Sequence, residues 1–203
     1  MDFARPAILS TANMINENYW REHYANKTQD KPSPFAKWAS PRITGNIVYD
    51  IGCGDGRDTV HLAKQHVVRA VDPFAPEGHH YYKGTWRHML RKWPVTGADT
   101  LYARWFFHAI TETEEDELLR RWRGELFLEG RVEVVNDDSH WRRPHDPDLL
   151  ADKLLLYGYV VEYLKVKRGW AKRGDDNPHI AASSRRSTRS PRWTSTAAVA
   201  ESK

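Results

Sequence analysis

Residues 47–58 read IVYDIGCGDGRD, and this stretch decides the fold. An apolar run ends at Asp50, and glycines follow at alternate positions, Gly52, Gly54 and Gly56. Because glycine has no Cβ, the backbone can turn tightly there and approach a ligand closely. A helical pattern comes next, and the free N–H groups and positive dipole end of a helix N-terminus favour a negative group. We therefore expect a nucleotide-type ligand site at the first strand–helix turn of a doubly wound sheet.

A second acidic strand end supports this site. Residues 67–72 read VVRAVD, which predicts a strand closed by Asp72. That acid follows the glycine loop at roughly the twenty-residue distance at which a carboxylate holds ribose hydroxyls. A glycine loop alone is equally compatible with an ordinary tight turn. The strand, helix and acid in register favour the ligand site.

The glycine spacing indicates which ligand is bound. A dinucleotide fingerprint requires G-x-G-x-x-G, but here the third glycine comes one residue early and Arg57 fills the expected position. The pattern G-x-G-x-G after an Asp-ended strand resembles motif I of the class I S-adenosylmethionine-dependent methyltransferases. That resemblance implies S-adenosyl-L-methionine as the cofactor. A nicotinamide oxidoreductase is the alternative, disfavoured by the early third glycine.

The resemblance extends beyond the glycine loop, from about residue 15 to residue 183. Other segments are similar to a bacterial and phage branch of class I methyltransferases, often found with sugar, polysaccharide or other small-molecule modification genes. These segments are Tyr19-Trp20, residues 32–36 (PSPFA), residues 104–110 (RWFFHAI), Arg142-Arg143 before residues 146–148, and Arg168-Gly169.

The expected fold class is α/β, a Rossmann-like doubly wound sheet of seven strands. The sheet is mostly parallel, and the resemblance implies that the last strand inserts antiparallel between the fifth and sixth. We expect a single domain over residues 1–183, with helices in residues 13–40 as a cap, and a disordered basic tail over residues 184–203. Strands are predicted at 47–50, 67–72, 81–85, 101–107, 131–135, 159–166 and 180–183. Helices are predicted at 13–24, 32–38, 56–65, 87–92, 114–123 and 147–157.

Local signals support several of these helices. Thr111 with Glu114, and Thr113 with Asp116, offer overlapping capping boxes. For the last helix, Asp146 is the expected N-cap, Pro147 the first residue and Gly158 the residue past the end. Its expected apolar face consists of Leu149, Leu150, Leu154 and Leu155, and Val60 and Ala63 are expected to face inward from the helix after the glycine loop. Glu129-Gly130 is expected to form a turn.

The resemblance assigns roles in cofactor binding. The three glycines approach the methionine part, Asp50 orders the loop or meets the ammonium, and Asp72 accepts from the ribose hydroxyls. Asp50 as a helix-loop cap and Asp72 as a turn former before Pro73 remain alternatives. Arg57 pairs with a carboxylate or is solvated, and Cys53 is a small filler. The expected cofactor residues are Asp50, Gly52, Cys53, Gly54, Gly56, Arg57, Asp72, Pro73 and Phe74.

Adenine recognition departs from the family pattern. Methyltransferases often place an acid after the third strand, whereas this chain has Gly84-Thr85-Trp86 there. Stacking on Phe74 or Trp86, together with backbone contacts, is the expected substitute.

The reaction requires alignment of a nucleophile with the S–CH₃ bond and exclusion of water. The carboxyl end of the fourth strand lies beside the glycine loop at the switch point, and Arg104 and His108 are expected there. His108 is the candidate base or acceptor-orienting group, and Arg104 would hold an anionic acceptor. A histidine that completes a helix start and an arginine in a structural ion pair are the alternatives.

Further residues are expected to bind the acceptor: Tyr19, Arg142, Arg143 and Arg168. The three arginines, together with His140 and His145, would cluster above the same strand ends. Several cations around a pocket suggest a phosphorylated or carboxylated acceptor, and the resemblance to the branch above implies a small, anionic or sugar-like molecule. Scattered surface charge is the alternative.

The net charge of +4 does not indicate nucleic-acid binding. Residues 183–203 hold four Arg and one Lys against one Glu, which leaves 26 basic and 26 acidic residues in the body. Such a tail cannot bury enough apolar surface to fold alone, and weak contact with an anionic surface is its other possible role. Residues 103–106 lack the Asp/Asn-Pro-Pro-aromatic motif of amino-methylating DNA enzymes. The absence of this motif disfavours nucleic-acid methylation, which stays an alternative only because the basic tail could bind a nucleic acid.

The cysteine count and the apolar segments bear on metal binding, disulfides and cellular location. The one cysteine, Cys53, excludes an intramolecular disulfide framework and a multi-cysteine metal site, and no metal is expected. No apolar stretch resembles a signal peptide or a membrane span, so we expect a cytoplasmic protein. The oligomeric state is left open. A non-catalytic cofactor-binding module is a further alternative, disfavoured because such a module needs neither the intact glycines nor Asp72.

Overall fold

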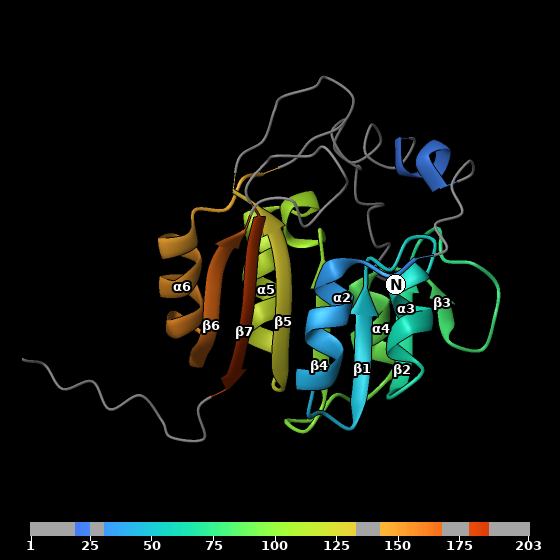
Figure 1. The fold of residues 1–203 in the computed structure, drawn as a ribbon, viewed down its shortest axis with the longest axis horizontal. Helices are drawn as coiled ribbons and strands as arrows, with labels where there is room; N and C mark the ends of the chain where they lie inside the picture. Colours follow the sequence, from blue (N-terminus) through green and yellow to red (C-terminus); the bar gives the residue numbers. More distant parts are fainter. Residues whose placement is uncertain (1–18, 25–30, 133–142, 168–178, 187–203) are drawn as a thin grey trace, which may run out of the picture.

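A seven-stranded sheet forms the centre of the molecule. The structure, a computed structural model, describes residues 19–24, 31–132, 143–167 and 179–186. The strand order is β3-β2-β1-β4-β5-β7-β6 (Figure 1). Strands β1 to β5 pair in parallel, and β7 lies antiparallel between β5 and β6. The expected fold class is confirmed, including the inserted last strand.

The elements follow the chain in alternation. The strands are β1 (Ile47–Ile51), β2 (Val67–Asp72), β3 (Tyr81–Lys83), β4 (Thr100–Arg104), β5 (Glu125–Arg131), β6 (Tyr159–Lys167) and β7 (His179–Arg186). The helices are α2 (Pro34–Ala39), α3 (Arg57–Leu62), α4 (Trp86–Lys92), α5 (Glu112–Arg121) and α6 (Pro147–Leu156), with short 3₁₀ turns η1 (Ser40–Arg42) and η2 (Phe107–Ala109). Residues 19–24 are also helical.

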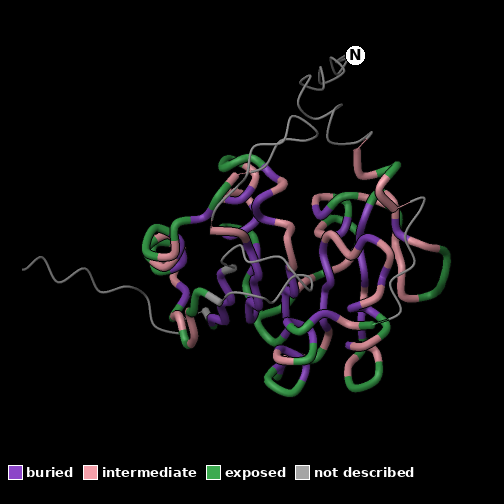
Figure 2. Tube along the Cα trace, turned by 45° about the horizontal axis from the view of Figure 1, so that its top comes forward, coloured by how far each residue is buried: buried purple, intermediate pink, exposed green. Residues whose placement is uncertain are grey.

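Helices cover both faces of the sheet because strand side chains alternate between them. Val48, Tyr102 and Phe127 pack on one face against α2 and α3. Their strand neighbours Tyr49 and Leu101 pack on the other face, where α4, α5 and α6 lie. The buried parts of the chain accordingly run along the strands, and the exposed parts gather in connecting turns (Figure 2).

Three helices begin with a side-chain cap, and the caps of α5 and α6 are those expected, although α5 begins at Glu112 and not at residue 114. The Ser33 hydroxyl accepts the Ala36 N–H before α2. Thr111 and Glu114 form a reciprocal capping box at α5, whereas Thr113 lies inside that helix. The Asp146 carboxylate caps α6 with Pro147 at the first position. These signals act over three residues, so tertiary contacts did not displace them.

Some expected boundaries were wrong. β5 begins at Glu125, not at residue 131, and residues 129–130 lie within it rather than in a turn. The reason is tertiary: the Glu129 side chain is buried against Arg104 on the neighbouring strand. β4 ends at Arg104, because the next residue, Trp105, has a φ of 55° and leaves the extended conformation.

Other expectations on packing were also corrected. On α6, Leu150 and Leu154 are buried, whereas Leu149 and Leu155 are exposed. Val60 on α3 is likewise exposed, and Ala63 packs against the core. A helix on the outside of a sheet buries a narrower stripe than its apolar residues suggest.

The ends of the domain compare with the expected boundaries as follows. Helix is described over residues 19–24 of the expected helix 13–24, and the rest of that helix lies outside the described residues. β7 continues to Arg186, past the boundary expected at residue 183, and the remainder of the basic tail lies outside the described residues. None of the helices in the described part of the chain has the length and apolar character of a membrane span.

One glycine at the base of the sheet is required by close packing. A Cβ on Gly124 would lie 1.9 Å from the Asp99 carbonyl oxygen, whereas a Cβ on Gly97 meets only an ordinary contact at 3.8 Å. We expect Gly124→Ala to lower the free energy of unfolding by about 1–3 kcal/mol, since a backbone carbonyl cannot move aside cheaply. Urea unfolding should show this loss, and Gly97→Ala should stay within about 0.5 kcal/mol of the wild type. Equal stability of the two variants would contradict the packing described.

Candidate functional site

A cleft opens where the carboxyl ends of β1, β2 and β4 meet. β1 lies between β2 and β4, so the chain order reverses there, and open α/β sheets bind ligands at such a point. The cavity measures about 710 Å³, within the range of roughly 300–1,000 Å³ typical of small-molecule sites. Its walls include the glycine loop, the residues after β2, β3 and β4, and the helix over residues 19–24.

The glycine loop forms one wall of the cavity. Gly52, Gly54 and Gly56 all have left-handed φ values, 71°, 56° and 79°. The Gly52 N–H donates to the Val71 carbonyl at 2.8 Å, which ties the loop to β2. A Cβ on Gly54 would lie 2.4 Å from the ring of Tyr24. The loop therefore needs glycine both for its turn and for what lies against it.

Asp72 connects the loop to the strand that follows it. Its carboxylate accepts the Gly54 N–H at 3.2 Å and the Phe74 N–H at 2.7 Å. The second bond is a turn over Pro73, so the turn-forming role expected as an alternative is present. Burial raises the pKa of Asp72. Asp72, Pro73 and Phe74 all line the cavity, and their roles toward a ligand stay predictions.

Asp50 lies under the loop, at the end of β1. It is 2% exposed, and one oxygen accepts the Thr59 hydroxyl of α3 at 2.6 Å. Burial above all, together with the neighbouring Asp58 and Asp72, raises the pKa of this carboxyl to about 7, although the Thr59 hydroxyl lowers it. Asp50 and Cys53 both line the cavity. The bond to Thr59 ties the end of β1 to α3, and the expected roles of Asp50 in loop order or ammonium binding stay predictions.

Arg104 forms a buried ion pair. Its Nε lies 2.8 Å from a Glu129 carboxylate oxygen and 3.7 Å from Asp58. Burial opposes the charge on Arg104, but these two carboxylates raise its pKa, and burial raises the pKa of Glu129 to about 7. Arg104 also lines the cavity. The alternative of a structural ion pair is thus what the structure shows, and a role in holding an acceptor stays a prediction.

Asp58 is a central residue that sequence reasoning missed. Its carboxylate accepts the Tyr102 hydroxyl at 2.9 Å, and the N–H and hydroxyl of Ser33 at 2.7 and 2.8 Å. These bonds join α2, α3 and β4 beneath the cavity. Arg57 lies 3.9 Å from Asp58 and lines the cavity, and burial lowers the pKa of Arg57. An acid in the first turn of the helix after the loop was the available signal.

His108 is placed at the cavity as expected. It lies in η2 just after β4, is 2% exposed and lines the cavity. Its carbonyl accepts the Arg143 N–H at 2.8 Å, so the segment before α6 is fixed beside it. Its proposed part as a base stays a prediction.

Of the other expected acceptor cations, the two that the structure describes, Arg143 and His145, lie away from the cavity walls. The Arg143 guanidinium pairs with Glu115, a fully buried carboxylate that also meets His145 at 3.4 Å and Lys153 at 3.2 Å. Burial, with the charges of Arg143 and Lys153, lowers the pKa of His145 to about 4. Among the described residues, the cavity walls do not include Arg143 or His145. The other three, His140, Arg142 and Arg168, lie outside the described residues.

An aromatic helix stands over the glycine loop. Tyr19 lines the cavity, as expected of an acceptor residue, together with Trp20, His23 and Tyr24, which sequence reasoning missed. Tyr19 stacks on His23 with ring centroids 5.6 Å apart, and Trp20 stacks on Tyr24 at 5.7 Å. Burial raises the pKa of Tyr24, and Asp72 raises it further. The aromatic residues spaced along residues 19–24 were the signal available.

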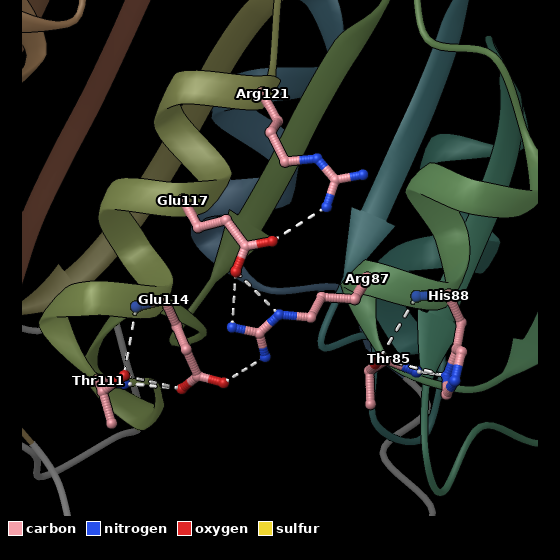
Figure 3. A network of polar contacts seen from close by, with 7 residues as sticks. All are labelled: Thr85, Arg87, His88, Thr111, Glu114, Glu117 and Arg121. Atoms are coloured by element: carbon pink, nitrogen blue, oxygen red, sulfur yellow. Dashed lines mark hydrogen bonds and ion pairs between the residues drawn. The ribbon is translucent and has the colours of Figure 1, made fainter. Parts of the chain in front are cut away.

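The opposite wall is held by an arginine clamp. Arg87 of α4 donates to Glu114 at 2.7 Å and to Glu117 at 2.8 Å, both on α5 (Figure 3). Its guanidinium lies 4.5 Å from the centre of the Trp86 ring. Glu114 also accepts from Thr111, so the clamp and the α5 cap share one carboxylate. Gly84, Thr85 and Trp86 line the cavity, and their part in adenine recognition stays a prediction.

Trp105 has the one strained backbone conformation among non-glycine residues of the described chain. Its φ of 55° is rare for a bulky side chain, and such conformations cost about 1–3 kcal/mol. The Trp105 N–H donates to the Glu129 carbonyl at 2.8 Å, which holds the turn. Trp105 and Phe106 both line the cavity. Strain of this kind concentrates at binding and catalytic sites.

Comparison with known proteins identifies the fold. A 1,6-didemethyltoxoflavin N1-methyltransferase from Burkholderia thailandensis, solved with 1,6-didemethyltoxoflavin and S-adenosylhomocysteine, has a TM-score of 0.56 at 15% identity, over 92% of this chain and 93% of its own. Magnesium protoporphyrin IX methyltransferase from Synechocystis PCC 6803, with bound S-adenosylhomocysteine, has a TM-score of 0.55 at 12% identity, over 92% and 90%. The chain has the class I methyltransferase fold.

The fold by itself leaves the activity open. The [4+2]-cyclase SpnF is similar at a TM-score of 0.56 and 11% identity, over 91% of this chain and 97% of its own. Neither a protein-family model nor a curated protein matches the sequence. Function must therefore be argued from the site.

The buried Asp50 predicts a pH-dependent stability. Its pKa of about 7 in the folded protein exceeds the ordinary value of about 4. Between these values the folded chain keeps a proton that the unfolded chain loses, so this contribution is complete below pH 4 and is lost as pH rises through 7. We expect Asp50→Asn, which does not titrate, to gain stability relative to the wild type by up to about 4 kcal/mol from pH 4 to pH 8.

Urea unfolding at several pH values measures this difference. The exposed Glu77 provides a surface control, and Glu77→Gln should stay within about 0.5 kcal/mol of the wild type. Parallel pH profiles for Asp50→Asn and the wild type would contradict the assignment.

Proposed function

We propose that this protein is an S-adenosyl-L-methionine-dependent methyltransferase that acts on a small-molecule acceptor. The observation that carries the proposal is the bond from the Gly54 N–H to Asp72. It joins a glycine-rich backbone turn to a ribose-binding type of carboxylate at one cavity. Gly52, Cys53 and Asp72 line this cavity together, so the residues present fit a nucleoside ligand.

Each part of the cofactor would meet a different wall. The glycine loop and Asp50 would hold the methionine part, and Asp72 would accept from the ribose hydroxyls. Phe74 and Trp86 line the cavity on the side where adenine would lie, and stacking on these rings would replace the missing acid. When bound, the cofactor supplies an electrophilic methyl group on sulfur.

The protein's contribution to the reaction would be alignment and proton removal. His108 lies at the end of β4, next to the glycine loop, where the acceptor would meet the methyl group. Its imidazole would take the proton of an acceptor hydroxyl or amine, typically a rate effect of about 10²–10⁴-fold. The aromatic helix over residues 19–24 would exclude water from the cleft.

The similar structures named above support a small acceptor, since they are described as toxoflavin-precursor and magnesium protoporphyrin methyltransferases. The narrower prediction of an anionic or sugar-like acceptor has less support. It was based on arginines, and both that are described, Arg104 and Arg143, pair with buried carboxylates. Membership of the bacterial and phage branch and a cytoplasmic location remain predictions.

Calorimetry separates this proposal from its alternatives. The full chain is titrated with S-adenosylmethionine, S-adenosylhomocysteine and NAD. We expect binding of the first two, and binding of NAD alone would overturn the proposal. Cofactor binding with no turnover on any acceptor would favour a non-catalytic module, and turnover on DNA or RNA alone would favour the nucleic-acid alternative.

Removal of the Asp72 carboxylate, which would bind the ribose hydroxyls, gives a sharper prediction. We expect Asp72→Ala to weaken S-adenosylhomocysteine binding by about 10–100-fold, because charge-assisted hydrogen bonds to the ligand are lost. Glu162→Gln, on the distant edge strand β6, is the matched control and should bind as the wild type does. Urea unfolding of Asp72→Ala tests that the loop still folds. Unchanged affinity in a folded Asp72→Ala protein would contradict the assigned role.

A further inference from the structure

The cavity has an unusually aromatic lining at its acceptor end. Trp105 and Phe106 follow β4, on the same side of the glycine loop as His108. Tyr19 and Trp20 reach the cavity from the helix above. Phe74 and Trp86 belong to the opposite side, after β2 and β3. Aromatic surface therefore remains at the acceptor end after adenine stacking is accounted for.

Trp105 is held rigidly at this end. Its backbone is fixed by the left-handed φ and by the bond to the Glu129 carbonyl. The Arg104 guanidinium lies 3.9 Å from the centre of its ring, and that of Arg131 lies at 5.3 Å. A ring positioned by strain and by cation–π contacts is prepared for binding, since little side-chain entropy remains to be lost.

The charge of the walls does not favour an anion. Counted over the described residues that line the cavity, the carboxylates are Asp50, Asp55, Asp58, Asp72 and Glu114, and the arginines are Arg57, Arg87, Arg104 and Arg131. The lining thus carries no net positive charge. Arg104 and Arg87 are moreover paired with carboxylates. A phosphate or carboxylate would add negative charge to a lining that already holds more carboxylates than arginines, and its desolvation is costly.

Three carboxylates of the cavity lining are hydrogen-bonded to neighbouring side chains. Asp50 binds Thr59, Asp58 binds Tyr102, and Glu114 binds Arg87. A sugar carries hydroxyl groups around its ring, and each needs a partner when it is buried. A flat ring needs few such partners and gains from stacking and apolar burial.

We propose that the acceptor is a planar aromatic or heteroaromatic molecule without negative charge, stacked in the Trp105–Phe106 end of the cavity with its reacting atom toward His108. This inference rests on the proposed methyltransferase function and narrows its acceptor. Trp105 is assigned as the residue that determines acceptor specificity.

The test uses paired probes on the full chain saturated with S-adenosylhomocysteine. 4-Hydroxyquinoline and 5-hydroxyindole are each compared with their 2-carboxylates, and glucose 6-phosphate is the sugar probe. We expect each neutral ring to bind about tenfold or more tightly than its carboxylate, with glucose 6-phosphate weaker still. Tighter binding of the carboxylates or the sugar phosphate overturns the proposal, and so does failure of every ring to bind.

Variants of Trp105 test the stacking itself. Trp105→Leu keeps apolar volume but removes the ring, and should weaken binding of the neutral rings about tenfold. Trp105→Phe keeps a ring and should stay within about threefold of the wild type. Trp38→Leu is the control, because Trp38 packs against Phe35 and Tyr163 on the α2 face, outside the cavity lining. Equal effects of Leu and Phe at position 105 would contradict a stacking role.

The experiments distinguish failure of the proposed methyltransferase function from failure of the proposed aromatic acceptor. S-adenosylhomocysteine affinity, measured first by calorimetry, should change less than about threefold in every Trp105 variant. If the wild type does not bind S-adenosylhomocysteine, the proposed methyltransferase function is overturned. Normal cofactor binding with preference for an anionic or sugar probe would overturn only the aromatic acceptor.

Discussion

The structure depends on one backbone constraint, the left-handed turn that follows β1. Residues 52–56 can take this path only with glycines at alternate positions, and the N–H groups of Gly52, Cys53 and Gly54 donate to the end of β2, which holds it in place. The turn brings the ends of β1 and β2 together, and the start of α3 follows directly from it. The other walls of the cavity, from residues 19–24 and from the residues after β2, β3 and β4, lie around this turn.

Buried charged side chains stabilise the elements around the glycine turn, and they do so by pairing with one another. Asp58 joins α2, α3 and β4, and Arg104 joins β4 to β5 through Glu129. Glu115 performs the same function between α5 and the segment before α6. Because removal of one partner leaves an uncompensated buried charge, such groups are costly to change. Arginines that a sequence suggests for an acceptor thus become part of the framework.

The fold supports more than one chemistry, as the similarity to a cyclase shows. The activity must come from the side chains that the fold places at the strand ends. Here these are a carboxylate at β2, a buried histidine after β4 and a group of aromatic rings. The first suits a nucleoside cofactor, and the other two suit a flat acceptor that must lose a proton.

The glycine turn, the acidic ends of β1 and β2, the caps of α5 and α6, and the class of sheet could all be predicted from the amino-acid sequence. These features are encoded over a few residues, where turn geometry and capping bonds act locally. Only the tertiary structure decided that Glu129 lies in a strand, that Arg104 and Arg143 are paired, and that residues 19–24 cover the loop. Each of these depends on contacts between residues far apart in the chain, and the identity of a charged residue does not reveal which partner will bury it.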